Sequence, residues 1–381
     1  MHIFFASHSA ELEGAERSLL TLCRASLDAA DTVTVVVPKR GPLLDHLVDL
    51  GVGRVHAGPA HVCIGGRLPR FLSPYRVTRG LVDVIRVGRL LRASRPDVVV
   101  TNSTANPTAS IAAALLKIPN VVMFRESLKS NAELRSLLPT GWYISMLKMV
   151  SNLQIPVSGF IASSLNVDGP ISYPDVATSV SSRTLDARPR SVDAGDPLRF
   201  VMLGSVTAEK GQSDAVEAVR IARSHGHDVR LDIYGPASAR SERSLLSTIK
   251  SCRVQDAVTY RGRVSDVGSV LGSAQATLVC SRNEAYGRVS GECIRAGVPV
   301  IGYRLGGTEE ILKFGGGLLC DPTPAALGSL LCEWALDPAI RVALVAECAK
   351  VAANAPIFGS ALHTMELIRA VPGRYTRPEV E

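Results

Sequence analysis

Two glutamates, Glu284 and Glu292, stand with seven residues between them. Each carboxylate can accept two charge-assisted hydrogen bonds at once, which matches a pair of neighbouring hydroxyls on a sugar. Gly287 lies between the two glutamates, ahead of a predicted helix. The amides that follow it can receive a diphosphate, because free N–H groups and the helix dipole favour an anion there. Sugar hydroxyls and a diphosphate together indicate a nucleotide sugar as the ligand.

A strand, a short helix and a second strand are predicted to position these glutamates. The apolar run 276–280 is typical of a buried strand, and 298–303 is typical of a second one. Between them, apolar residues over 289–296 recur at helical spacing, Gly297 ends the helix and Pro299 prevents its continuation. Ligands of parallel sheets collect outside the carboxyl ends of the strands, where both glutamates are expected to lie.

The sequence resembles the retaining glycosyltransferases of family four. The resemblance is carried by Glu284 and Glu292, the turn Ala-Gly-Val-Pro-Val at 296–300, the Gly-Gly pair at 306–307 and Glu310. The resemblance implies an α/β protein with the GT-B fold, which has two Rossmann-like, doubly wound parallel-sheet domains facing a central cleft. It also implies that Glu292 binds the ribose of a nucleotide sugar and that Glu284 positions the donor sugar.

A second loop is similar to the family's diphosphate-binding loop, which ends in Lys-Gly. Lys210 matches, whereas Ser205 occupies the place where the family usually has an arginine. Diphosphate binding is therefore expected to depend on Lys210, with Arg288 as a further cation. The resemblance also places the nucleobase at two strand ends. The predicted donor-binding residues are Gly14, Gly204, Ser205, Lys210, Tyr234, Gly235, Arg263, Val264, Gly287, Arg288, Val289 and Glu292.

The amino-terminal half departs from the family at two points. Glu13 replaces the first glycine of the loop that includes Gly14, so a side chain stands where glycine would allow a positive φ. Arg125 and Glu126 follow a predicted strand, where the family often carries a histidine or an acid near the reacting sugar. The predicted catalytic residues are Glu284, Glu126 and Arg125, although a structural Arg-Glu pair is an equally good interpretation of the latter two.

The predicted domain boundaries follow changes in composition. Residues 1–178 form an acceptor-binding domain whose last strand is predicted over 159–163. A linker over 179–197 is rich in Ser, Arg, Asp, Pro and Gly. Residues 198–355 form the nucleotide-sugar domain, and 356–381 are expected to return as a helix to the first domain.

Composition excludes several classes of protein. The chain has 381 residues, of which 46% are hydrophobic and 20% charged, with a mean hydropathy of +0.19, so it folds and is not disordered. No apolar run reaches the roughly 18 residues of a membrane span, and the amino terminus reads as the first strand of a cytoplasmic protein. Eight scattered cysteines form no Cys-x-x-Cys pair and are expected to be buried apolar residues.

Positive charge gathers in one segment. The net charge is +7, and eight arginines lie within 67–95, at positions 67, 70, 76, 79, 86, 89, 92 and 95. A helix over 77–91 is predicted to turn Leu81, Val84, Ile85, Gly88 and Leu91 toward the core, with Arg79, Arg86 and Arg89 elsewhere. Two interpretations remain open, a solvated helix and a surface for an anionic membrane or an acidic acceptor.

The sequence thus predicts a metal-independent and cofactor-free hexosyltransferase. It would move a sugar from a nucleoside diphosphate to a saccharide, lipid-linked or small-molecule acceptor in cell-envelope polysaccharide or glycoconjugate biosynthesis, in the cytoplasm or at the inner face of the membrane. The alternatives are a nucleotide-sugar epimerase or phosphorylase of the same architecture, or a catalytically silent basic module that binds membrane or nucleic acid. Only 5% of residues are aromatic and no aromatic-basic strip appears, which disfavours nucleic acid. No Gly-x-Gly-x-x-Gly fingerprint follows the first strand, which disfavours a dehydrogenase.

Overall fold

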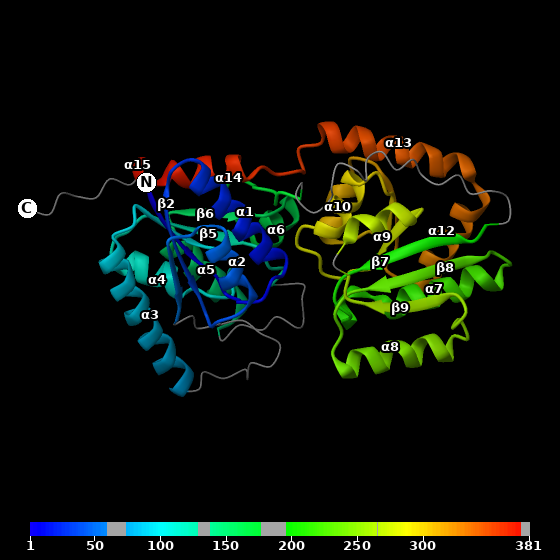
Figure 1. Cartoon of the computed structure of the whole chain (residues 1–381), viewed down its shortest axis with the longest axis horizontal. Helices are drawn as coiled ribbons and strands as arrows, with labels where there is room; N and C mark the ends of the chain where they lie inside the picture. The colour runs from blue at the N-terminus through cyan, green and yellow to red at the C-terminus, as the bar shows by residue number, and fades with distance from the viewer. Residues whose placement is uncertain (59–73, 129–137, 177–195, 265, 375–381) are drawn as a thin grey trace, which may run out of the picture. The chain divides into compact units, whose positions relative to one another are not determined.

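The computed structural model describes residues 1–58, 74–128, 138–176, 196–264 and 266–374. These fall into two compact units (Figure 1). Unit 1 comprises Met1–Asp175 and Gly359–Glu381, and unit 2 comprises Val176–Phe358. The predicted linker 179–197 lies outside the described residues except for its last two. In the described part of the chain, no helix has both the length and the apolarity to cross a bilayer.

Unit 1 is built on a parallel sheet of six strands in the order β3-β2-β1-β4-β5-β6. Its strands read as near-continuous apolar runs because helices cover both faces of such a sheet. The strands are β1 (His2–Ala6), β2 (Thr32–Val37), β3 (Arg54–Ala57), β4 (Val98–Thr101), β5 (Asn120–Phe124) and β6 (Leu153–Pro156).

The helices of unit 1 divide into two packed groups. Helix α1 contacts α2 and α14, whereas α4 contacts both α3 and α5. The helices are α1 (Gly14–Asp28), α2 (Pro42–Asp49), α3 (Pro74–Ser94), α4 (Thr108–Leu115), α5 (Thr140–Val150), α6 (Gly159–Leu165), α14 (Ala361–Arg369) and α15 (Val371–Arg374).

Unit 2 repeats the design with a parallel sheet in the order β12-β11-β10-β7-β8-β9. Its core includes Phe200 and Trp334, whose ring centroids lie 6.3 Å apart. The strands are β7 (Leu198–Leu203), β8 (Val229–Tyr234), β9 (Val258–Gly262), β10 (Ala276–Val279), β11 (Val300–Tyr303) and β12 (Gly317–Cys320). The helices are α7 (Gln212–Ser224), α8 (Ala239–Ser251), α9 (Val267–Ser273), α10 (Arg288–Arg295), α11 (Gly306–Leu312), α12 (Pro324–Leu336) and α13 (Pro338–Asn354), with a 3₁₀ turn at Ala208–Lys210.

Both sheets have the doubly wound topology that the sequence predicts. The strand order reverses beside the first strand of each unit, between β1 and β4 in unit 1 and between β7 and β10 in unit 2. Loops that leave the carboxyl ends of these strand pairs diverge, which opens a crevice for ligands. The two reversal points therefore define where each unit can hold a small molecule.

The strand predicted over 159–163 is wrong, because this segment lies in helix α6. The amide of Ile161 donates to the hydroxyl of Ser158 over 3.1 Å, which caps the helix, and Asn166 ends it in a left-handed conformation. Local capping thus outweighs the β propensity of Phe160 and Ile161. The last strand of unit 1 is β6, just before it.

The predicted apolar face of helix α3 is also partly wrong. Gly88 and Leu91 are buried as expected and Val84 is half-buried, but Leu81 and Ile85 are exposed. Val87, which was not assigned to this face, is buried instead. The helix carries apolar residues on two adjacent stripes, both at helical spacing, and only one stripe packs on α4. Arg67 and Arg70 lie outside the described residues.

Buried cysteines behave as the sequence predicts. Cys23, Cys280, Cys293, Cys320 and Cys348 are buried, and burial raises the pKa of each thiol. Cys252 and Cys332 are half-buried, and Cys63 lies outside the described residues.

Candidate functional site

The loops at the reversal point of unit 2 bring the predicted glutamates together with two cations. Nζ of Lys210 lies 2.6 Å from Oε2 of Glu284, and a guanidinium nitrogen of Arg288 lies 3.0 Å from Oε1 of Glu292. All four side chains are partly exposed, with no more than 29% of any one accessible to solvent. The site therefore presents two carboxylates and two cations to solvent at the carboxyl edge of the sheet.

Glycines allow the backbone of these loops to approach closely. Gly211 follows Lys210 with φ of +71°, and a Cβ there would lie 2.5 Å from the carbonyl oxygen of Cys280. Gly306 has φ of +57°, and its Cβ would lie 2.6 Å from the carbonyl oxygen of Glu284. That carbonyl accepts a hydrogen bond of 2.7 Å from the amide of Gly307. The Gly-Gly pair thus fixes the backbone that carries Glu284.

Helix α10 begins at this point with its amides directed toward the site edge. Its N-cap, Gly287, has φ of +92° and makes no side-chain capping bond. The helix begins with Arg288, and its first-turn amides have no earlier turn of the helix to bond. The positive end of the helix dipole adds to the charges of Arg288 and Lys210, which favours an anion.

A polar network that sequence reasoning missed holds the two loops in register. Glu209 accepts a bond from the side-chain amide of Asn283, and its carbonyl accepts one of 2.8 Å from the amide of Arg282. Arg282 also pairs with Asp214 at 2.6 Å, and the hydroxyl of Tyr303 donates to Asp214 over 2.9 Å. Nothing in the one-dimensional spacing of these residues indicates that they meet.

Tyr303 remains a donor in this network. Burial raises the pKa of its phenol, and the negative charge of Asp214 adds to the effect. The phenol is therefore protonated at neutral pH and keeps Asp214 as an acceptor.

The remaining predicted donor residues of unit 2 lie along the same edge of the sheet. Gly204 and Ser205 follow β7, and Gly235 follows Tyr234, the last residue of β8. Gly204 and Gly235 both have positive φ, and a Cβ on Gly235 would lie 1.9 Å from the carbonyl oxygen of Gly204. These strand ends therefore tolerate only glycine at position 235.

Other predicted donor residues flank this edge. Arg263 and Val264 follow β9, and Val289 is in the first turn of α10. The carbonyl of Ser205 accepts a bond of 3.0 Å from the side-chain amide of Gln212, so this loop is tied to the start of α7.

In unit 1, Gly14 begins helix α1 at the carboxyl edge of the sheet. The preceding Glu13 has φ of −100° and ψ of −169°, an extended conformation that any residue adopts. The glutamate in place of the family's glycine is thus compatible with the backbone observed here.

Glu126 is engaged with the loop that follows β4. Its carboxylate accepts bonds from the hydroxyls of Ser103 and Thr104, and from the amide of Thr104 at 3.0 Å. The carbonyl of Thr104 in turn accepts a bond from the buried hydroxyl of Tyr143. These contacts give Glu126 a clear role in holding this loop at the reversal point of unit 1.

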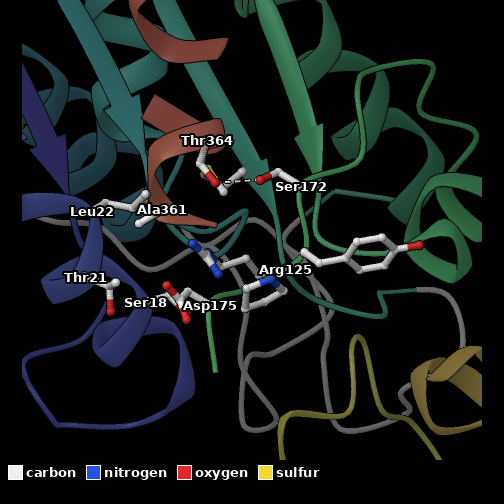
Figure 2. A pocket seen from close by; sticks show the side chains of 11 residues that line it. Ser18, Thr21, Leu22, Arg125, Ser172, Asp175, Ala361 and Thr364 are labelled. Atoms are coloured by element: carbon white, nitrogen blue, oxygen red, sulfur yellow. Dashed lines mark hydrogen bonds between the residues drawn. The ribbon is translucent and has the colours of Figure 1, made fainter. Parts of the chain in front are cut away.

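Arg125 lies beside a small pocket that is formed within unit 1 (Figure 2). In Figure 2 its guanidinium points toward Ser18 of α1 and the neighbouring Asp175. The far wall includes Ser172 and Thr364, whose hydroxyl oxygens lie 2.6 Å apart. The structure therefore directs Arg125 toward α1 and α14, while Glu126 holds the loop after β4.

A buried polar cluster beside Arg125 was not predicted. Glu16 is 1% exposed, and Nδ1 of His8 lies 3.3 Å from its carboxylate. Burial raises the pKa of Glu16, while the charges of His8 and Arg125 act in the opposite direction. Nearby, the buried amide of Asn102 donates to the carbonyl of Ala15 over 3.0 Å. The signal available in the sequence was the run of polar residues directly after each of two apolar strands.

A metal centre is not apparent in the described residues, where no three potential metal-ligating side chains gather. Lys210, Arg288 and the start of α10 supply positive charge at the unit 2 site.

Two protein-family models match this chain. Residues 12–166 match the model of "Glycosyltransferase Family 4", and 185–352 match that of "Glycosyl transferases group 1". An N-acetyl-alpha-D-glucosaminyl L-malate synthase from Bacillus anthracis is 33% identical over 79 residues, which are 20% of this chain and 21% of the relative. A D-inositol 3-phosphate glycosyltransferase from Pseudarthrobacter chlorophenolicus is 28% identical over 214 residues, 53% of this chain and 49% of the relative. The matches thus span at most about half the length of these curated relatives.

Solved structures share the fold over almost the whole chain. HepE from Anabaena in complex with UDP superimposes with a TM-score of 0.76 at 16% identity, covering 97% of this chain and 100% of that one. A sucrose-phosphate synthase from Thermosynechococcus elongatus gives a TM-score of 0.74 at 16% identity, covering 98% and 99%. The two family models together match most of the chain, along two doubly wound units, so the chain belongs to the family 4 glycosyltransferases and has the GT-B fold.

Proposed function

We propose that this chain is a metal-independent, retaining hexosyltransferase that uses a nucleoside diphosphate sugar as its donor. The observation that carries the proposal is the pair of ion pairs at the reversal point of unit 2, Lys210 with Glu284 and Arg288 with Glu292. A nucleotide sugar is complementary to both pairs, because its hydroxyls suit the carboxylates and its diphosphate suits the cations.

Donor binding would exchange these ion pairs for contacts with the ligand. Glu292 would accept bonds from the ribose hydroxyls, and Glu284 would accept them from the donor sugar. The released cations, Lys210 and Arg288, would then face the diphosphate together with the first amides of α10. In the free protein each of the two carboxylates is already paired with a cation, so these charges are balanced before the donor arrives.

The same charges would support the chemical step. Departure of the diphosphate leaves negative charge on its outer phosphate and positive character on the sugar ring. Preorganised cations and amides stabilise such charge without reorganisation at the moment of reaction. Lys210 would carry most of this task, because Ser205 stands where an arginine would otherwise contribute. The nucleobase would lie against Tyr234, Gly235, Arg263 and Val264.

The acceptor would be held by unit 1, at the reversal point framed by Glu126 and the loop after β4. The two relatives are named for inositol 3-phosphate and L-malate, which are small and anionic. A small polar acceptor is therefore favoured, and a saccharide or lipid-linked acceptor is the second choice. The product would enter cell-envelope polysaccharide or glycoconjugate synthesis on the cytoplasmic side of the membrane.

Thermal stabilisation by a panel of nucleoside diphosphates and nucleotide sugars tests donor binding. A ligand at a hundred times its dissociation constant adds about 2.7 kcal/mol to the free energy of unfolding. Product analysis then separates the reactions. A transferase releases nucleoside diphosphate only when an acceptor is present, whereas an epimerase converts the donor without one. Stabilisation by no nucleotide, or donor conversion without an acceptor, contradicts the proposal.

A further inference from the structure

Tyr286 lies midway between Glu284 and Arg288 in the loop that precedes α10. Its side chain is buried, with 4% exposed, so it is not itself a donor-binding group. Its hydroxyl donates a buried hydrogen bond of 2.9 Å to the carbonyl oxygen of Ile357. The loop that carries two of the proposed donor-binding residues is therefore anchored to a segment 71 residues further along the chain.

Ile357 belongs to the segment by which the chain leaves unit 2. Unit 2 begins at Val176 and ends at Phe358. This segment follows helix α13, which packs against α10, and the side chain of Ile357 is buried. The bond from Tyr286 thus joins the loop before α10 to the place where the chain passes from unit 2 to unit 1.

Helix α10 has a glycine where these segments meet. A Cβ on Gly291 would lie 3.1 Å from the hydroxyl oxygen of Tyr286, 3.5 Å from a methyl carbon of Val176 and 3.6 Å from a ring carbon of Phe358. The guanidinium of Arg295, at the end of the same helix, lies 5.1 Å from the ring centroid of Phe358, which is a cation–π contact. The first and last residues of unit 2 therefore both pack on α10, beside the tyrosine hydroxyl.

The Gly-Gly pair constrains the backbone of the same loop. A Cβ on Gly307 would lie 2.2 Å from the carbonyl carbon of Tyr286, and the amide of Gly307 donates to the carbonyl of Glu284 over 2.7 Å. The loop is thus held through its backbone by α11 and through the side chain of Tyr286 by Ile357. Coupling between distant sites travels through such chains of packed and hydrogen-bonded groups. A displacement of Ile357 is therefore transmitted to the backbone that carries Glu284.

We propose that Tyr286 is a positioning residue that couples the donor site of unit 2 to the segment by which the chain leaves that unit. Its bond to Ile357 holds Glu284, Arg288 and the first amides of α10 as the donor requires, and a bound diphosphate in turn restrains residues 355–358. The coupling acts in both directions, because linkage between two sites is reciprocal. This role of Tyr286 rests on the proposed function, since the donor is the ligand that it serves.

Hydrogen exchange in the free protein tests the link without a ligand. The amides of Ala355, at the end of α13, and of Gly291, in α10, each donate to a backbone carbonyl. Tyr286→Phe should speed exchange of both amides about tenfold, because the lost bond makes local opening easier. The control is Tyr143→Phe, which removes the same hydroxyl from a buried tyrosine of unit 1 that also donates to a backbone carbonyl. It should leave both amides unchanged.

Exchange with bound nucleotide measures the coupling itself, with UDP and GDP as separate probes. A saturating nucleoside diphosphate should slow exchange at Ala355 about fivefold in the original protein, the lower end of typical couplings between sites. The amide of Cys252, at the end of α8, is the internal reference, because it also donates to a backbone carbonyl at a helix end. It should not respond. In Tyr286→Phe the protection of Ala355 should be lost even at saturating nucleotide, which the loss of a merely structural contact would not produce.

Nucleotide affinity separates the coupling from the proposed function. By reciprocity, Tyr286→Phe should weaken nucleoside diphosphate binding about fivefold, whereas Tyr143→Phe should bind like the original protein. Exchange at Ala355 that is the same in Tyr286→Phe and the original protein, with and without nucleotide, would overturn the coupling alone. If the original protein binds neither UDP nor GDP, the proposed function and the positioning role both fail.

Discussion

At the scale of single residues, the proposed function gives Glu284 and Glu292 different tasks. We expect Glu292→Ala to weaken nucleoside diphosphate binding at least tenfold, because a lost charged hydrogen-bond partner is worth about 1.5–3 kcal/mol. Glu284→Ala should leave that affinity nearly unchanged and lower turnover, because its carboxylate would bind only the donor sugar. Calorimetry with nucleoside diphosphate measures the first effect. If Glu292→Ala binds nucleoside diphosphate as tightly as the original protein does, Glu292 does not bind the ribose.

Lys210 is expected to act on the outer phosphate. Lys210→Ala should therefore weaken nucleoside diphosphate binding much more than nucleoside monophosphate binding, and chelator should change neither affinity. The matched control is Lys313→Ala, which removes the same charge from an exposed position on α11's C-cap. A strict requirement for a divalent ion would show instead that a metal carries the leaving group.

Glu16 gives the protein a predictable response to pH. Its folded-state pKa is raised above the ordinary value of 4.5, mainly by burial. The protonated form thus favours folding below pH 4.5, and this contribution is lost as pH rises through the folded pKa. Glu16→Gln should therefore raise the free energy of unfolding at pH 7 relative to the original protein, and the gain should shrink toward pH 4. Urea unfolding at both pH values measures it. If Glu16→Gln raises the free energy of unfolding by the same amount at both pH values, the raised pKa of Glu16 is contradicted.

At the scale of elements, the Gly-Gly pair fixes how α11 meets the loop before α10. A Cβ on Gly307 would lie 2.2 Å from the carbonyl carbon of Tyr286. Gly307→Ala should destabilise unit 2 by about 3 kcal/mol, since backbone atoms cannot yield as a side chain does. Gly272→Ala in α9 is the control, because its Cβ meets nothing within 4 Å. It should be neutral or stabilising by up to about 1 kcal/mol. If Gly307→Ala and Gly272→Ala unfold at the same denaturant concentration, the close approach of Gly307 to the Tyr286 backbone does not limit stability.

Sequence reasoning succeeded where local patterns decide the element. Runs such as Thr32–Val37 and the stop at Gly297 determine strands and helix ends directly. It failed where tertiary packing decides. The segment 159–163 has a strand-like composition but forms a helix that Ser158 caps. Helix α3 has two apolar stripes, and only one of them packs against α4. The sequence also did not predict the contacts of Glu209 with Asn283 and of Asp214 with Arg282, because these residues come together only when the sheet forms.

At the scale of the whole molecule, the two units share one topology but differ in chemistry. The reversal point of unit 2 has paired cations and carboxylates beside a helix start, as a diphosphate sugar requires. At the reversal point of unit 1, Glu16 and asparagines such as Asn102 are buried, and the carboxylate of Glu126 holds the loop after β4. The proposed function accordingly assigns the donor to unit 2 and the acceptor to unit 1.

A structure determined with a bound nucleoside diphosphate tests the central claim most directly. The account predicts that the outer phosphate lies within hydrogen-bond distance of Lys210 Nζ, that the inner phosphate meets the amides at the start of α10, and that Glu292 accepts bonds from the ribose hydroxyls. The pair between Lys210 and Glu284 should be open. A nucleotide bound along the sheet edge of unit 1, or a diphosphate away from both Lys210 and α10, would contradict the account.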